Sequence, residues 1–149
     1  MTKKTVVITG ASSGLGKATA LEFARQGWWV AIADINQARG VEVVAEIEAL
    51  GGQAFYQHCD VSKGEDIQAL NDHCLTVWNK IDVLINNAGI VSALGAIDRV
   101  PLDEWQRAFD INVMGVVKGC AIFTPTFKAQ GSGHIVNIAS IAGLLTIPG

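Results

Sequence analysis

Three glycines near the start of the chain have a spacing suited to binding a phosphate group. Gly10, Gly14 and Gly16 follow an apolar run, residues 5–8, and the last two flank Leu15, where a helical pattern starts. The unpaired N–H groups and the dipole at a helix N-terminus attract negative charge. Glycine has no Cβ atom to obstruct a diphosphate, and it adopts left-handed backbone angles freely. The turn therefore predicts a dinucleotide site, although an ordinary tight turn between a strand and a helix would need the same glycines. The residues of this turn expected to contact the dinucleotide are Gly10, Ser12, Ser13, Gly14, Leu15 and Gly16.

An acidic residue follows these glycines at a distance typical of dinucleotide sites. Asp34 ends the apolar run 28–33. Its offset from Gly16 is close to the roughly 20 residues at which a carboxylate accepts hydrogen bonds from the adenosine ribose. The alternative is that Asp34 only caps the helix that follows it. A carboxylate here would repel a ribose 2′-phosphate, so the residue favours NAD over NADP.

These residues need a scaffold in which strands and helices alternate. Apolar runs predict strands over residues 5–8, 28–33, 54–59 and 81–85, with a fifth within residues 133–140. Between them, apolar residues at helical spacing predict helices over residues 15–24, 36–50 and 62–78, and from Pro101 towards Phe123. Ser62 and Glu65 have the spacing of a capping box. This alternation is typical of one α/β domain over residues 1–149, a doubly wound, Rossmann-like parallel sheet with strand order 3-2-1-4-5 and helices on both faces.

Two motifs carry a resemblance to a known family. Thr9 and the three glycines give the spacing Thr-Gly-x-x-x-Gly-x-Gly after the first predicted strand, and Asn86-Asn87-Ala88-Gly89 follows the fourth. In both motifs the chain resembles the short-chain dehydrogenase/reductase family. The resemblance implies that the residues after the third and fourth strands contact the cofactor's adenine and ribose, namely Asp60, Val61, Asn87, Ala88 and Gly89. Ile35, directly after Asp34, is also expected to contact the cofactor. Ser13 and Ile35 occupy positions where the family's NADP-binding members tend to carry a basic residue, and neither is basic.

The resemblance also implies two residues that take part in the reaction. Asn112 would help to hold a water molecule of the proton relay, and Ser140, after the fifth strand, would hydrogen-bond the substrate oxygen. Each has a simpler interpretation, as a polar residue tolerated within a helix and as a turn residue. The Tyr-x-x-x-Lys motif that follows the serine in the family does not occur in this sequence, whose one tyrosine is Tyr56. We therefore expect the sequence to be the N-terminal part of a longer enzyme.

The function implied is the interconversion of an alcohol and a carbonyl group by hydride transfer, with NAD preferred to NADP and a small alcohol or ketone as substrate. The resemblance further implies a homo-oligomer, a dimer or a tetramer. The alternative is a non-catalytic dinucleotide-binding or assembly module that keeps only the half-site from Gly10 to Asp60. The related nucleotide-sugar epimerases are less favoured, because both motifs belong to the shorter branch of the superfamily.

The composition argues against several other classes. With 11 Lys and Arg against 14 Asp and Glu, a net charge of −3 offers no basic surface for nucleic acid. The three cysteines have no paired spacing, which favours reduced thiols and a cytoplasmic location. His58-Cys59 and His73-Cys74 lack the spacing of zinc ligands, so no metal is expected. Polar residues interrupt the uncharged stretch 131–149, which predicts a strand and a loop and no membrane span.

Overall fold

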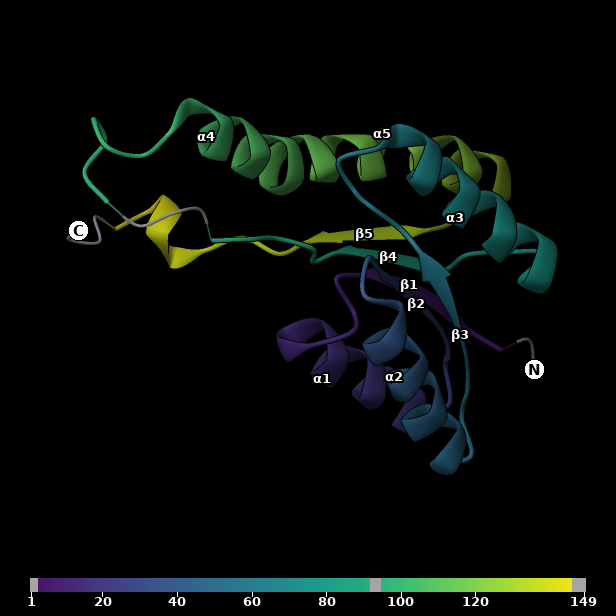
Figure 1. The fold of residues 1–149 in the computed structure, drawn as a ribbon. Coiled ribbons are helices and arrows are strands. Elements are labelled where there is room, and N and C mark those ends of the chain that lie inside the picture. The colour runs from purple at the N-terminus through teal and green to yellow at the C-terminus, as the bar shows by residue number, and fades with distance from the viewer. Residues whose placement is uncertain (1–2, 92–94, 146–149) are drawn as a thin grey trace.

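The fold is a five-stranded parallel sheet in the order β3-β2-β1-β4-β5. It is seen in a computed structural model that describes residues 3–91 and 95–145. The strands are β1 (Thr5–Thr9), β2 (Trp29–Asp34), β3 (Gln53–His58), β4 (Val83–Asn86) and β5 (His134–Asn137). The doubly wound α/β fold and the strand order predicted from the sequence are confirmed (Figure 1).

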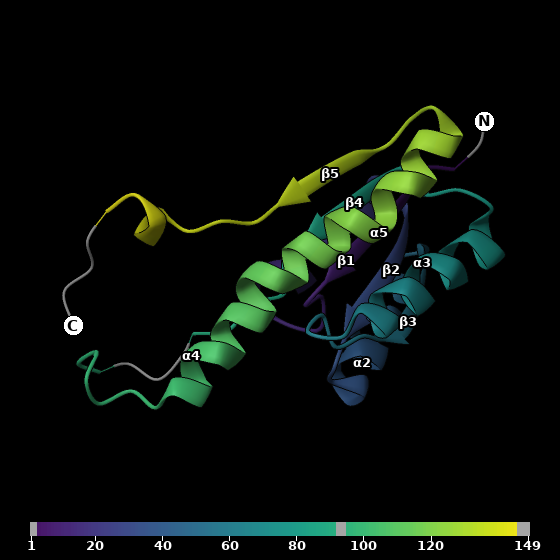
Figure 2. The same cartoon turned by 90° about the horizontal axis from the view of Figure 1, so that it is seen from above.

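Helices cover both faces of this sheet. On one face lie α1 (Gly14–Arg25) and α2 (Gln37–Ala49), and on the other lie α3 (Gly64–Trp78) and α5 (Gly115–Gln130) (Figure 1). The helix α4 (Leu102–Phe109) extends the line of α5 beyond the carboxyl ends of the strands. Seen from above, α4 and α5 form one long rod that crosses the sheet, with α3 beside it (Figure 2). None of the helices in the described part of the chain is both long and apolar enough to cross a membrane.

Each layer of helices encloses its own hydrophobic core. Side chains of a strand point alternately to the two faces. Val7 of β1 therefore packs with Leu84 and Phe123 on the α3 and α5 side. Its neighbours Val6 and Ile8 pack on the α1 and α2 side. Burial on both faces explains why the central strands are continuous apolar runs.

Two details of the helices differ from the prediction. The continuous helix expected from Pro101 towards Phe123 is interrupted by a π-helical segment, Asp110–Met114, between α4 and α5. The predicted capping box is wrong, because Lys63 is the N-cap of α3 and makes no side-chain cap bond. The Ser62 hydroxyl instead donates to Asp60 Oδ1 at 2.7 Å. Asp60, two residues after the end of β3, therefore competes successfully for the hydroxyl that the helix would have used.

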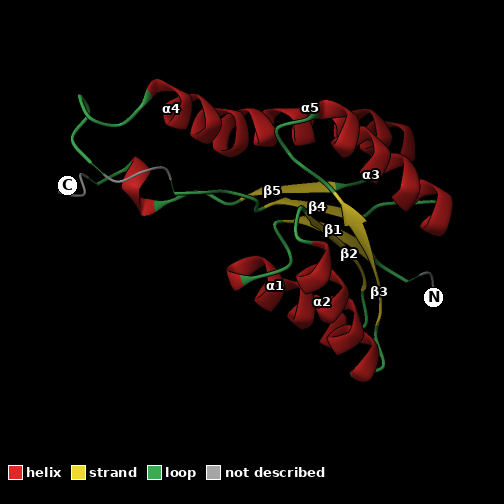
Figure 3. Cartoon of the chain, viewed as in Figure 1, coloured by secondary structure: helices red, strands yellow, loops and turns green. Residues whose placement is uncertain are grey.

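The chain beyond β5 runs past the carboxyl edge of the sheet as an extended segment. A short 3₁₀ helix, Ile141–Gly143, follows, and the Ser140 hydroxyl caps it by accepting a hydrogen bond from the Ala142 N–H at 3.1 Å. Figure 3 shows this turn of helix at the same end of the molecule as α4. The expectation of a strand and a loop within residues 131–149 is confirmed as far as residue 145.

Candidate dinucleotide site

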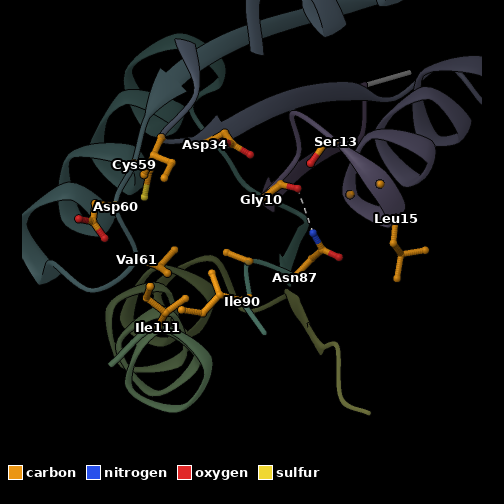
Figure 4. Close-up of a pocket in the computed structure, with 15 residues that line it drawn as sticks. Gly10, Ser13, Leu15, Asp34, Cys59, Asp60, Val61, Asn87, Ile90 and Ile111 are labelled. Carbon is orange, nitrogen blue, oxygen red and sulfur yellow. Dashed lines mark hydrogen bonds between the residues drawn. The ribbon is translucent and has the colours of Figure 1, made fainter. Parts of the chain in front are cut away.

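A cavity of about 380 Å³ lies where β1, β2, β3 and β4 end. The carboxyl ends of parallel strands are where open α/β sheets bind ligands. Of the residues predicted to contact a dinucleotide, all but Ser12 line this cavity (Figure 4). Three residues that were not predicted also line it: Cys59, Ile90 and Ile111. The lining residues are Gly10, Ser13, Gly14, Leu15, Gly16, Asp34, Ile35, Cys59, Asp60, Val61, Asn87, Ala88, Gly89, Ile90 and Ile111.

The glycines of the turn after β1 are required by the backbone itself. Gly10 and Gly14 have φ angles of +64° and +52°, in the left-handed region that glycine adopts without strain. A Cβ atom at Gly16 would collide with the Gly10 carbonyl oxygen, so the first turn of α1 can lie this close to β1 only with glycine there. Beyond Gly14 no atom lies within 4 Å of the position of a Cβ atom, which leaves open space above the helix N-terminus. These features fit a bound diphosphate.

Asn87 joins the end of β4 to the glycine turn. Its side-chain Nδ2 donates to the carbonyl oxygens of Thr9 at 2.9 Å and Gly10 at 3.1 Å (Figure 4 shows the second bond). The Thr9 hydroxyl accepts the N–H groups of Asn87 and Ala88, both at 3.1 Å. Thr9 is the first residue of the Thr-Gly-x-x-x-Gly-x-Gly motif, but no contact was predicted for its side chain. Four hydrogen bonds thus hold together two of the segments that line the cavity.

Asp34 connects the turn to the second strand. Its Oδ2 accepts the N–H of Ser12 at 3.0 Å, and its Oδ1 accepts the N–H of Asn36 at 2.9 Å. The side chain that caps α2 is that of Asn36, which accepts from the Arg39 N–H, so Asp34 is not the helix cap. Asp34 is only 9% exposed and lines the cavity, and each carboxylate oxygen keeps a free lone pair.

Ser12 lies outside the cavity. Ser12 is buried behind the turn and gives its N–H to Asp34. Its contact with the cofactor stays a prediction. Its place in the structure is to fix the distance between the turn and the end of β2. Ser13 and Gly14, which follow it, are exposed at the rim.

Asp60 lies two residues after β3, and its surroundings favour the ionised carboxylate. Its Oδ1 accepts both the N–H and the hydroxyl of Ser62, at 3.0 and 2.7 Å. Partial burial acts to raise the pKa of Asp60, but these hydrogen bonds, with Lys63 and His58 nearby, outweigh it and lower the pKa. An ionised carboxylate accepts hydrogen bonds only, which suits the amino group of an adenine ring.

Apolar side chains form the wall between Asp60 and the end of β4. Val61, Ile90 and Ile111 lie together on this side of the cavity (Figure 4). Cys59 is 3% exposed, and its burial, followed by the negative charges of Asp66, Asp60 and Asp34, raises the pKa of its thiol to about 12. The thiol therefore acts here as a small uncharged side chain. Nothing in their residue types distinguished Cys59 or Ile111 from core residues.

The two residues predicted to act in the reaction do not line the cavity. Asn112 lies in the π-helical segment and pairs with the backbone of Ile90, accepting its N–H and donating to its carbonyl oxygen, both at 2.8 Å. Its side-chain amide is thus committed to the loop after β4. Ser140 is exposed beyond β5, and its hydroxyl oxygen accepts the Ala142 N–H. Their roles in catalysis stay predictions.

Comparison with known proteins agrees with this geometry. Residues 4–149 match the sequence model of the short chain dehydrogenase family. An uncharacterized oxidoreductase of Listeria monocytogenes is 41% identical over 98% of this chain and 58% of its own length. A cyclohexanol dehydrogenase of an Acinetobacter strain is 38% identical over 97% of this chain and 57% of its own length. The chain thus spans less than two thirds of the length of these curated relatives.

Solved structures share the fold over the same portion. A short chain dehydrogenase/reductase from Burkholderia phymatum, in complex with NAD, superposes with a TM-score of 0.95 at 39% identity, covering 99% of this chain and 52% of that one. A metagenomic short-chain oxidoreductase in complex with NADP superposes with a TM-score of 0.91 at 32% identity, covering 97% of this chain and 65% of that one. With the sequence match over nearly its whole length and the arrangement of its sheet and cavity, the chain belongs to the short-chain dehydrogenase family.

Proposed function

We propose that the protein is an NAD-dependent oxidoreductase that interconverts an alcohol and a carbonyl compound. The observation that carries this proposal is the cavity itself, in which the glycine turn, the Asp34 carboxylate and the Asn87–Gly89 segment face one space. The glycine turn would hold the diphosphate, Asp34 the adenosine ribose, and Asp60 with Val61 the adenine. When bound, NAD would supply the hydride acceptor, and its reduced form the hydride donor.

The preference for NAD rests on the charges that face the cavity. A 2′-phosphate on the ribose would lie beside the Asp34 carboxylate, and like charges in a partly buried site repel. Among the described residues that line the cavity, none is a lysine or an arginine. Lys17, one residue after the turn, is paired with Glu46 at 2.7 Å. NADP would therefore meet repulsion from Asp34 without a facing countercharge.

For the chemical step, we propose that Ser140 orients the substrate oxygen and that Asn112 supports the proton relay. Ser140 follows a strand adjacent to β4, at the edge of the sheet where the cavity opens. Tyr56 is not placed to transfer a proton, because its hydroxyl donates to the Asp34 carbonyl oxygen at 2.8 Å on the adenosine side. A general acid/base acting with Ser140 would contribute about 10²- to 10⁴-fold to the rate.

We also propose that the protein is cytoplasmic and self-associates. An apolar stripe with one residue every four positions runs along α4, the π-helical segment and α5, and is formed by the partly exposed side chains of Trp105, Phe109, Val113 and Val117. A second copy would cover this stripe by packing helix against helix. Light scattering of the whole natural protein should give a dimer or a tetramer, and Phe109→Glu should shift it to monomer. A monomeric wild type would contradict the proposal.

The function is tested on the whole natural protein by measuring cofactor binding and turnover separately. We expect NAD to bind with a lower Kd than NADP, and secondary alcohols to reduce bound NAD. Gly16→Ala, which would force a Cβ atom against Gly10, should abolish both; Gly64→Ala, in open space at the start of α3, is the matched control and should change neither. Binding without turnover over a broad panel of alcohols and ketones would favour the non-catalytic module.

A further inference from the structure

The end of β2 is held by a side chain from the neighbouring strand. The Asp34 carbonyl oxygen accepts the N–H of Cys59 at 3.2 Å and the hydroxyl of Tyr56 at 2.8 Å. The register of β2 and β3 pairs Ile32 with Tyr56 and Asp34 with His58. The Tyr56 side chain therefore reaches forward along β2 to its last residue, and the two bonds use both lone pairs of the Asp34 carbonyl.

The side chain of Tyr56 is held in one place by the residues packed around its ring. Its ring packs on the α1 and α2 side of the sheet, against the core that contains Ile32 and Val43. A Cβ atom at Gly40 of α2 would collide with the ring, so glycine at this position makes the space that the ring fills. Burial, and then the negative charge of Asp34, raise the pKa of Tyr56. The hydroxyl stays protonated and remains a donor.

These contacts determine where the Asp34 carboxylate points. Each carboxylate oxygen already accepts one backbone N–H, from Ser12 or from Asn36. The remaining lone pairs can face a ribose only while the main chain of Asp34 stays in place. A small movement of this strand end would turn the carboxylate away from the ribose hydroxyls, and would also reduce its repulsion of a 2′-phosphate.

We propose that Tyr56 is a positioning residue for cofactor discrimination, which fixes the end of β2 so that Asp34 selects NAD over NADP. This inference rests on the proposed function. Tyr56 touches neither cofactor nor substrate, and it acts through Asp34.

The variant that tests it is Tyr56→Phe, which keeps the ring over Gly40 and removes only the hydroxyl. Losing one hydrogen bond of about 0.5–1.5 kcal/mol corresponds to a change of about two- to twelvefold in an equilibrium constant. We expect the ratio of the NADP Kd to the NAD Kd to fall by roughly that factor, chiefly through weaker NAD binding. Titration calorimetry on the whole natural protein gives both constants, and the urea midpoint of each variant reports its stability.

The matched control is Thr126→Val, which removes a hydroxyl that donates to Asn71 Oδ1 at 3.0 Å between α5 and α3. It should lower the urea midpoint and leave the Kd ratio unchanged. In an Asp34→Ala background, Tyr56→Phe should no longer change the ratio, because no carboxylate is left to position.

Two results would overturn the inference, and they are distinguishable. If the wild type binds NAD more tightly than NADP but Tyr56→Phe keeps the same ratio, Tyr56 is only structural and the proposed function stands. A wild type that binds neither cofactor would overturn the proposed function, and the inference with it, before any variant is compared.

Discussion

Asp34 is hydrogen-bonded to three other segments of the chain. Its carboxylate accepts N–H groups from the glycine turn and from the turn before α2, and its carbonyl oxygen accepts the Tyr56 hydroxyl. The buried Ser12 N–H would have no acceptor without it, and an unsatisfied buried donor costs about 1–3 kcal/mol. The residue that we propose to select the cofactor therefore also stabilises the site around it.

Asp34→Ala should consequently change both binding and stability. Hydrogen bonds to a charged group contribute about 1.5–3 kcal/mol, so NAD binding should weaken by roughly ten- to a hundredfold. The Kd for NADP should change less, because the variant loses the hydrogen bonds of Asp34 to the ribose and at the same time its repulsion of the 2′-phosphate. The free energy of unfolding should fall by about 1–3 kcal/mol as the Ser12 N–H loses its acceptor. Calorimetry and urea unfolding measure the two effects.

Asp72→Ala removes the same charge from α3, where the side chain accepts a hydrogen bond from Gln68 on the surface. It should leave the preference for NAD intact. An unchanged ratio of the two dissociation constants in Asp34→Ala itself would refute the assignment of Asp34 to the ribose.

The helix α5 approaches the sheet through two glycines. A Cβ atom at Gly115 would lie 2.9 Å from Val61 Cγ2, and one at Gly119 would collide with Asn86 Oδ1. The side chain of Asn86 is buried and donates to Asn137 Oδ1 at 2.9 Å, which links the ends of β4 and β5. The contact at Gly119 thus sets the height of α5 above the two strands that lead to Asn87 and Ser140.

Gly119→Ala should destabilise the protein even though alanine favours a helix. The added methyl group would push α5 away from the sheet or displace the Asn86 amide, and such overpacking typically costs about 1–3 kcal/mol. The gain in helix propensity is about 1 kcal/mol and would offset only part of this cost. Urea unfolding should show a lower midpoint, with an unchanged slope.

Gly64→Ala serves as the control for helix propensity, because no atom lies within 4 Å of a Cβ atom at that position in α3. It should leave the midpoint unchanged or raise it. Equal stability of the wild type and Gly119→Ala would mean that α5 can move without cost.

The strands and most helices could be predicted because their signal is local. Continuous apolar runs such as residues 28–33 mark strands buried on both faces, and the observed strand there, Trp29–Asp34, has bounds close to those predicted. The π-helical segment could not be predicted, because it accompanies the pairing of Asn112 with Ile90, which lies in a loop far away in the sequence. The capping box failed for a similar reason, since Asp60 lies outside the motif and takes the Ser62 hydroxyl.

The site could be predicted where a residue type is needed for its chemistry. The glycines and Asp34 were found because few residues substitute for a small turn residue or for a carboxylate at a strand end. Ser12, which is predicted to contact the cofactor, is buried and does not line the cavity, and no local signal in the sequence separates it from Ser13. Cys59 and Ile111 escaped notice because an apolar wall has the same composition as a hydrophobic core.

In the part of the chain that the structure describes, burial is greatest at the middle of the sheet. β1 and most of β2 are buried on both faces, whereas β5 has half-buried residues flanked by exposed ones. Two of the three cysteines lie in the buried region: Cys59 after β3 and Cys74 in α3, both packed in the core beneath α3 and α5. Folding therefore places two titratable thiols where a charge is costly.

The overall stability should in consequence fall in alkaline solution. Burial raises the pKa of Cys59 from 9.0 to about 12 and raises that of Cys74 as well. Above about pH 9 the thiols of the unfolded chain release protons that the folded thiols keep. The unfolded state then binds fewer protons, so the free energy of unfolding decreases as the pH rises, by at most about 1.4 kcal/mol per pH unit for each thiol.

Cys74→Ala should make this decrease shallower, whereas Val43→Ala, which trims a core side chain that does not titrate, should lower the stability equally at every pH. Urea unfolding from about pH 8 to about pH 11 measures the slope; a slope that Cys74→Ala leaves unchanged would show that the buried thiol does not contribute to it.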